Sequence, residues 1–187
     1  IIINKKVKIS NNQRPLIVAE ISANHCGNKK KFISHIKKAA SSGADLIKIQ
    51  TYEAEDMTIR SDSKSFKLKE GLWKGNNLWR LYSKAQTPFE WHDDAFKIAK
   101  KMKKVIFSTP FSERGVDLLE KLNVQIYKIS SFEITDLNLV EKISKTRKPI
   151  ILSTGISNKK EIRKCMKLIN KYHNKVIILH CVSGYPT

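Results

Sequence analysis

Six short apolar runs, each rich in β-branched residues, alternate along this chain with five amphipathic segments, and this alternation restricts the possible folds more than any other feature. Apolar runs of this kind are typical of strands that are buried on both faces, as in a parallel sheet covered by helices. We therefore predict strands over residues 16–22, 45–51, 104–109, 125–131, 149–154 and 176–182. We predict helices over residues 29–42, 89–103, 113–122, 136–146 and 159–172. The fold class is α/β.

Two parallel architectures have this pattern. A dinucleotide-binding fold needs a glycine-rich first turn, but residues 22–27 read SANHCG and no other turn supplies GxGxxG. We therefore favour the N-terminal portion of a (β/α)8 TIM-type barrel with about six βα units. Residues 1–9 contain two apolar runs separated by Asn4-Lys5-Lys6, which predicts a small β-hairpin that caps the bottom of the barrel. We expect residues 1–187 to be a truncated barrel domain of a longer protein.

A long insert, residues 52–88, follows the second predicted strand. On a βα scaffold such an insert overhangs the C-terminal face of the sheet, where substrate-covering loops lie. Aromatic residues gather in or beside it, which fits either a substrate cover or a small satellite core: Tyr52, Trp73, Trp79, Tyr82, Phe89 and Trp91.

Composition excludes several classes of protein. With 187 residues and 41% hydrophobic content the chain can bury a core, so we expect a folded domain. The formal charge of +19 raises the question of nucleic acid, but the lysines are scattered over predicted helices without interleaved aromatic residues, so we favour a solvated surface. Three cysteines without CxxC spacing argue against a disulfide framework, and no apolar stretch approaches the roughly 18 residues that span a bilayer. We expect a cytoplasmic protein that binds neither membranes nor nucleic acid.

Charged side chains occur at or near the C-terminal ends of several predicted strands, where parallel α/β folds build active sites. Lys48 lies between two isoleucines and Lys128 between Tyr127 and Ile129, and a buried ammonium group needs an anionic partner. Both lysines could clamp a phosphate or carboxylate, form a Schiff base, or extend to solvent from a strand end. Glu20 and Glu133 are candidates for a general base or substrate anchor, or for ion pairs with these lysines.

Hydroxyl groups occur at the same level of three strands, in Ser108-Thr109, Ser130-Ser131 and Ser153-Thr154. Together with backbone amides they could form an anion cradle. The alternative role for such residues is helix N-capping, which we expect from Ser112, Thr135 and Ser157.

Histidines give a weaker signal. His180 closes an apolar strand and could ligate a divalent metal or act in acid–base chemistry, as could His25, but a core histidine is more often satisfied by the backbone. We expect His35, His92 and His173 to be surface or packing residues.

These motifs resemble, in order, those of the sialic acid synthase family, which condenses phosphoenolpyruvate with an amino sugar. The matching blocks are IVAEISANHCG at 17–27, GADLIKIQT at 43–51, STPF at 108–111, YKISSFE at 127–133, PIILSTG at 149–155 and LHCVSGYPT at 179–187. The insert, with GLW at 71–73 and TPFEWH at 87–92, is similar to that of members that make pseudaminic acid.

The resemblance implies roles for individual residues. Lys48, Thr109 and Lys128 would hold the carboxylate and phosphate of phosphoenolpyruvate, with hydrogen bonds from Ser131 and Ser153. Glu20 and Gln50 would face the sugar aldehyde, Glu133 would transfer a proton, and Phe111 and Tyr185 would contact substrate. His180 would be one ligand of a divalent metal, Mn or Mg. The resemblance further implies a homodimer and an antifreeze-like domain beyond Thr187.

Alternatives remain open beside this interpretation. The sugar product could be N-acetylneuraminic or legionaminic acid, or the chain could be an inactive fragment of such an enzyme. A lysine Schiff-base aldolase on the same fold and a basic nucleic-acid-binding module are further possibilities.

Overall fold

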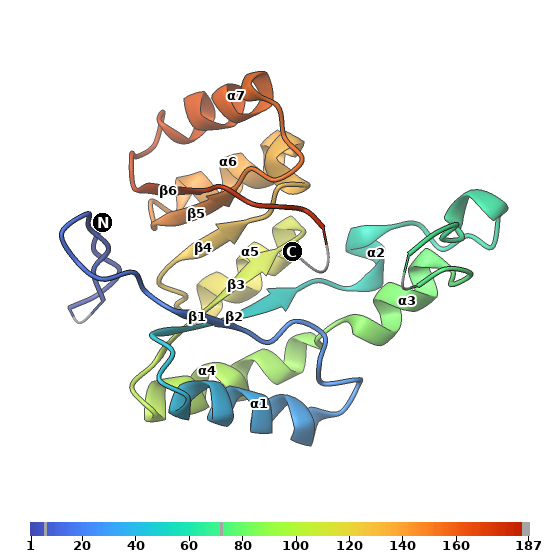
Figure 1. The fold of residues 1–187 in the computed structure, drawn as a ribbon, viewed down its shortest axis with the longest axis horizontal. Coiled ribbons are helices and arrows are strands. Elements are labelled where there is room, and N and C mark those ends of the chain that lie inside the picture. The colour runs from blue at the N-terminus through green and yellow to red at the C-terminus, as the bar shows by residue number, and fades with distance from the viewer. Residues whose placement is uncertain (6, 72, 185–187) are drawn as a thin grey trace.

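The computed structural model describes residues 1–5, 7–71 and 73–184. Its centre is a single parallel sheet of six strands in chain order (Figure 1). The strands are β1 (Val18–Glu20), β2 (Leu46–Thr51), β3 (Val105–Pro110), β4 (Tyr127–Ile129), β5 (Ile150–Ser153) and β6 (Val176–Leu179). Every predicted strand is present, and the sheet order equals the chain order, as expected for half of a (β/α)8 barrel.

Five helices connect the strands: α1 (Lys29–Ser41), α4 (His92–Lys101), α5 (Glu113–Lys121), α6 (Leu137–Lys145) and α7 (Lys159–Ile169). In Figure 1, α1 and α4 lie beside the β1 end of the sheet and α6 and α7 beside the β6 end. All five predicted helices are confirmed. The predicted helix over residues 89–103 begins later, because Pro88 is followed by a 3₁₀ turn, η2 (Phe89–Trp91).

Helix starts show where the capping prediction was right and where it was wrong. Ser112 caps α5, and its hydroxyl accepts a hydrogen bond from the Gly115 amide. The caps of α6 and α7 are Asp136 and Asn158 rather than Thr135 and Ser157. Asp136 and Asn158 are each one residue closer to the helix than Thr135 and Ser157. Their side-chain oxygens can therefore accept hydrogen bonds from the free backbone amides of the first turn.

The N-terminal hairpin is present as an antiparallel bridge between Ile2 and Lys8; Lys6 lies outside the described residues. Ile3 is buried in the main core, and the Asn4 side chain donates a hydrogen bond to Gln125 Oε1 at 2.8 Å. Since Gln125 lies just before β4, this contact holds the hairpin at the N-terminal end of the strands (Figure 1).

The long insert contains α2 (Ala54–Met57), a 3₁₀ turn η1 (Lys64–Phe66) and α3 (Leu78–Ala85). It extends beyond the C-terminal end of β2, as predicted (Figure 1). Tyr52 connects it to the barrel, since its ring makes edge contacts with Tyr82 and Phe111 at centroid distances of 6.1 and 5.4 Å. Trp73 is 55% exposed, so the aromatic side chains of the insert are not all buried in a satellite core.

Strands β1 and β6 form the two edges of the sheet, which does not close within the described residues. Both edges expose apolar side chains: Ile17, just before β1, is 59% exposed and Ile178 on β6 is 52% exposed. By contrast, all six residues of the central strand β3 are buried. None of the helices in residues 1–5, 7–71 and 73–184 is both long and apolar enough to cross a membrane.

Phe107, on β3, is 1% exposed and belongs to the main core, so Phe107→Ala should lower the free energy of unfolding by about 3–5 kcal/mol. Equilibrium urea unfolding measures this effect. Phe132→Ala is the matched control, because Phe132 is 70% exposed and its removal should cost less than about 1 kcal/mol. Equal losses in the two variants would contradict the assigned core.

Candidate functional site

The parallel register assigns the polar strand residues to one face of the sheet. Glu20 pairs with Lys48, and Gln50 pairs with Thr109. Ser108 pairs with Tyr127, so Thr109 is at the level of Lys128. Because alternate residues of a strand point to opposite faces, these side chains share the face opposite the one where the Tyr127 hydroxyl bonds Glu120 of α5. They therefore line the concave side of the half-barrel.

Lys48 and Glu20 form an ion pair across β1 and β2. Glu20 also accepts a hydrogen bond from the Ser22 amide at 2.9 Å, which fixes one carboxylate oxygen. The Lys48 side chain is 15% exposed and that of Glu20 is 41% exposed, so the pair lies at the rim of the concave face. The structure thus supports the ion-pair interpretation of Glu20, since each of its carboxylate oxygens has a protein partner.

Lys128 is the most deeply buried charged residue of the site, with 7% of its surface exposed. Its ammonium group donates to the Ile129 carbonyl at 2.7 Å, and no carboxylate of the described residues lies within ion-pair distance. Burial, together with the nearby charge of Lys48, lowers the pKa of Lys128 to about 8. The anion that a buried lysine requires is therefore not supplied by these residues.

Thr109 lies beside Lys128 and is 1% exposed, yet its hydroxyl group has no hydrogen-bond partner among the described residues. A buried polar group without a partner is unfavourable and calls for a ligand, an ion or water. An unpartnered hydroxyl next to an uncompensated ammonium group is the arrangement expected of an anion site.

Ser108, which the sequence grouped with Thr109, belongs to the opposite face. Its hydroxyl donates to the Ile49 carbonyl at 3.1 Å and lies 2.6 Å from Thr51 Oγ1. The Ser108 hydroxyl thus already has two protein partners. The prediction that both hydroxyls of this pair belong to an anion cradle is therefore wrong for Ser108.

Glu133 begins η3 (Glu133–Thr135), directly after β4, and accepts a hydrogen bond from the Ser130 hydroxyl. Burial raises the pKa of Glu133 to about 7, although the Lys128 charge acts in the opposite direction. A carboxyl group that titrates near neutral pH can both donate and accept a proton, as a general acid or base must.

Hydroxyl groups surround Gly155, in the turn after β5. A methyl group added at Gly155 would lie 2.2 Å from Ser183 Oγ and 3.1 Å from Ser131 Oγ. Ser153 hydrogen-bonds the Cys181 thiol in the same region. Burial alone would raise the pKa of Cys181, but the bonds from Ser153 and the Thr154 and Gly155 amides, with the Lys128 charge, lower it below its usual range. Donors thus converge here on a site that favours negative charge.

The other predicted residues lie as follows. Phe111 is half-buried against Tyr52, and Gln50 is half-buried on the concave face. Tyr185 lies outside the described residues. His180 is exposed, directly after β6.

The described residues do not fit a metal centre, since no three His, Cys, Asp or Glu side chains among them gather closely enough to hold an ion. His180 would therefore need further metal ligands from outside the described residues.

Sequence reasoning missed a buried hydrogen-bond network behind the site. His92, fully buried at the start of α4, places Nε2 2.8 Å from Thr51 Oγ1, which in turn contacts Ser108. His25 is also fully buried, with Nε2 3.2 Å from Thr87 Oγ1. Burial lowers the pKa of both histidines, so His92 is a neutral link between the insert and the end of β2, and His25 is one between the insert and the loop after β1. The TPFEWH block was the signal that could have indicated this role.

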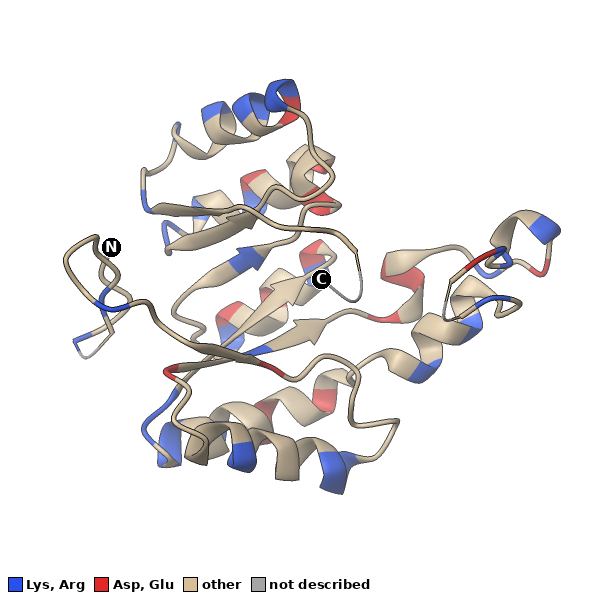
Figure 2. Ribbon diagram, in the orientation of Figure 1, with Lys and Arg blue, Asp and Glu red and all other residues tan. Residues whose placement is uncertain are grey.

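Lysine and arginine residues are spread over the outer helices and the insert rather than gathered on one strand surface (Figure 2). This distribution agrees with the solvated-surface interpretation of the net charge.

Fold and site together define a class: a parallel βα half-barrel with a cationic, hydroxyl-lined site at the C-terminal edge of its strands. Within that class the sequence is assigned by a profile of the NeuB family, which matches residues 35–187. The chain belongs to the NeuB family.

Curated relatives agree with this assignment. The chain is 45% identical over 176 residues to a pseudaminic acid synthase of Helicobacter pylori, covering 94% of this chain and 52% of that protein. It is 41% identical to a pseudaminic acid synthase of Campylobacter jejuni, covering 94% and 51%. An N,N'-diacetyllegionaminic acid synthase of Campylobacter jejuni is 35% identical, covering 93% and 53%. The chain thus spans about half the length of these relatives.

Solved structures confirm the barrel class. The N-acetylneuraminic acid synthetase of Leptospira borgpetersenii, in complex with citrate, superposes with a TM-score of 0.82 at 26% identity, over 97% of this chain and 60% of that one. A truncated 3-deoxy-D-arabino-heptulosonate 7-phosphate synthase of Thermotoga maritima superposes with a TM-score of 0.62 at 14% identity, over 98% and 57%, a likeness of fold alone. The predicted half of a TIM-type barrel is therefore confirmed.

The contrast between Ser108 and Thr109 yields a test on two adjacent residues. Ser108→Ala removes the bonds to Ile49 and Thr51 and should lower the free energy of unfolding by about 1–3 kcal/mol. Thr109→Val removes a hydroxyl that bonds nothing in the described structure and should change it by less than about 0.5 kcal/mol. Thermal and urea unfolding measure both. A larger loss for Thr109→Val than for Ser108→Ala would show that the two hydroxyls have been assigned to the wrong faces.

Proposed function

We propose that the protein containing this chain is a synthase that condenses phosphoenolpyruvate with an amino-sugar aldehyde, giving a nonulosonic acid and phosphate. The observation that carries the proposal is Lys128, a buried ammonium group without a carboxylate partner, beside the unpartnered hydroxyl of Thr109. A phosphate or carboxylate would satisfy both groups at once.

The residues of the chain divide this task among them. Lys128 and Thr109 bind one anionic group of phosphoenolpyruvate, and Lys48, which shares their concave face, binds the other. Ser131, Ser153 and the amides near Gly155 supply further donors. Gln50 and the partly exposed Glu20 carboxylate face the aldehyde, because both residues belong to the concave face. Phe111 and Tyr185 remain proposed substrate contacts.

In the proposed reaction the terminal CH₂ carbon of the phosphoenolpyruvate double bond attacks the aldehyde carbon, and the aldehyde oxygen takes up a proton. Water then adds at the neighbouring carbon, which bears the phosphate. The bond between this carbon and the phosphate oxygen breaks, and phosphate is released. Glu133, with a pKa near 7, is the group placed to take a proton from the attacking water and return it. The predicted requirement for Mn or Mg, with His180 as one ligand, stays part of the proposal without support from the described residues.

The sugar we propose is 2,4-diacetamido-2,4,6-trideoxy-altrose, and the product pseudaminic acid. The identities of 45% and 41% to pseudaminic acid synthases, against 35% to a legionaminic acid synthase, support this choice over the legionaminate and N-acetylneuraminate alternatives. We also propose that residues 1–187 are part of a cytoplasmic homodimer whose barrel continues into an antifreeze-like domain, as the family resemblance implies.

A Schiff-base aldolase remains the second candidate, because the lowered pKa of Lys128 also suits an amine nucleophile. Borohydride reduction in the presence of pyruvate would attach a three-carbon adduct to Lys128 if this candidate were correct. An unmodified Lys128 in the intact-mass spectrum would remove it.

Phosphate release from phosphoenolpyruvate tests the proposal directly. The full-length gene product, supplied with Mn, should release phosphate with the trideoxy-altrose and not with N-acetylmannosamine, and Lys128→Met should abolish release because the anion loses its buried counter-charge. Residues 1–187 assayed alone report whether this part of the chain is sufficient. Turnover with N-acetylmannosamine would redirect the proposal to N-acetylneuraminate, and no turnover with either sugar would overturn it.

The affinity for phosphoenolpyruvate should fall as pH rises from 7 to 9. Over this range Lys128, with its pKa lowered to about 8, loses its positive charge, while Glu133, with its pKa raised to about 7, becomes an anion. Both changes disfavour an anionic ligand, and loss of one charge-assisted hydrogen bond corresponds to about tenfold in affinity. Titration calorimetry measures the change. Lys128→Arg is the control, because arginine stays charged and its profile should be flatter; parallel profiles would exclude Lys128 as the titrating group.

A further inference from the structure

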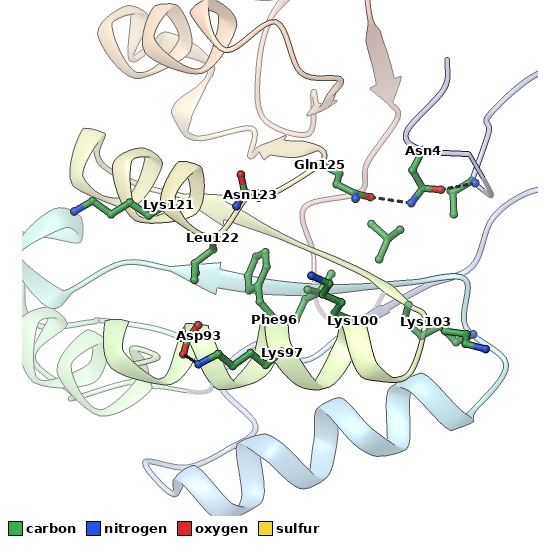
Figure 3. A pocket seen from close by; sticks show the side chains of 14 residues that line it. Asn4, Asp93, Phe96, Lys97, Lys100, Lys103, Lys121, Leu122, Asn123 and Gln125 are labelled. Carbon is green, nitrogen blue, oxygen red and sulfur yellow. Dashed lines mark hydrogen bonds and ion pairs between the residues drawn. The ribbon is translucent and has the colours of Figure 1, made fainter.

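A second pocket lies at the opposite end of the sheet from the candidate site (Figure 3). Its walls come from α4 and the start of β3, from the end of α5, and from the N-terminal hairpin. Its volume is about 570 Å³, within the range of small-molecule sites. The proposed synthase activity assigns no role to this pocket.

The pocket combines an apolar interior with a cationic rim. Phe96 extends from α4 into it, near Leu122 at the end of α5 (Figure 3). Val105 and Ile106 of β3 also line it. Five lysines line it against a single carboxylate, that of Asp93.

Two of the five lysines are already engaged. Lys97 pairs with Asp93, and Lys104 donates to the Ala44 carbonyl at 2.6 Å. Lys100, Lys103 and Lys121 are exposed, and their ammonium groups make no hydrogen bond or ion pair with the described part of the chain. Three positive charges therefore remain uncompensated around an apolar interior.

The helix ends do not account for these charges. Helices α4 and α5 both end here, and each C-terminus carries the equivalent of about half a negative charge. Three ammonium groups outweigh the resulting single charge. None of the three donates to a terminal carbonyl, as a lysine that caps its own helix would.

We propose that this pocket binds a small phosphorylated compound with a ring-shaped body, of the nucleoside phosphate class. The phosphates meet Lys100, Lys103 and Lys121, and the ring lies against Phe96 and Leu122. The polar groups of Asn123 and Gln125, which also line the pocket, are in reach of polar groups on the ring. A ligand here contacts the hairpin as well as α4 and α5, so it joins segments that are distant in sequence.

Titration calorimetry of the full-length gene product, with ADP as the probe, tests the proposal. The double variant Lys100→Gln/Lys121→Gln should bind ADP at least about tenfold more weakly, because two charge-assisted contacts are lost. Lys101→Gln is the matched control: Lys101 is exposed in the same turn of α4 but does not line the pocket, and its affinity should change less than about twofold. Pyrophosphate should bind more weakly than ADP, and Phe96→Leu should reduce that difference.

Several outcomes would overturn the proposal. One is no ADP binding, and another is an equal loss in Lys101→Gln, which would indicate attraction to diffuse surface charge. Displacement of ADP by phosphoenolpyruvate would place the anion in the candidate active site instead. Duplex DNA that competes equally in all variants would reveal a nonspecific polyanion surface. Because ADP binding is measured without turnover, failure of the proposed synthase activity would leave this test unaffected.

Discussion

The burial of the Lys128 ammonium group without a carboxylate partner is the constraint on which the candidate site depends. A pKa lowered from 10.5 to about 8 corresponds to about 3 kcal/mol against the charged form, first from burial and then from the charge of Lys48. The residues around Lys128 offset this free-energy cost only in part. A single carbonyl accepts a hydrogen bond from Nζ, and burial raises the pKa of Glu133 to about 7, so that its carboxyl group is only partly ionised at neutral pH. A protein that kept this lysine for stability alone would place a carboxylate beside it. The described structure instead leaves Lys128 without a carboxylate and Thr109 without a hydrogen-bond partner, as expected of groups that bind an anion from solution.

The alternation of the strands separates residues that hold the scaffold from residues that meet a ligand. On the convex side, Ser108, Thr51 and His92 satisfy one another, and the network continues to the insert through Pro88. On the concave side, one residue away along the same strands, Gln50 is half-buried and the buried Thr109 hydroxyl has no partner among the described residues. Because the two sets are adjacent in sequence, any shift of the convex network displaces the concave groups with it. The insert and the site are thus mechanically connected through a few buried hydrogen bonds.

Much of the fold follows from the sequence, because few other folds alternate continuous apolar runs, typical of strands buried on both faces, with amphipathic helices. All six strands and five of the helices were predicted, with ends that differ by a few residues, whereas α2 and α3 of the insert were not predicted. Predictions that depended on the orientation of a single side chain were less successful. Ser108 and Thr109 are both hydroxyl residues at a strand end, and only the register tells them apart. The capping roles of Asp136 and Asn158, and the buried bonds of His92, likewise depend on backbone positions that composition does not reveal.

The agreement between sheet order and chain order has a consequence for how the molecule is made. Each strand from β2 to β6 pairs with the strand that precedes it in the chain, so every new βα unit meets a partner that the ribosome has already released. No strand waits for a distant segment before it can pair. Strand β6, whose Ile178 is 52% exposed, is the last strand of the described sheet to pair in this order. Synthesis from the N-terminus can therefore build the sheet one unit at a time, with the buried lysine already in place when β5 docks.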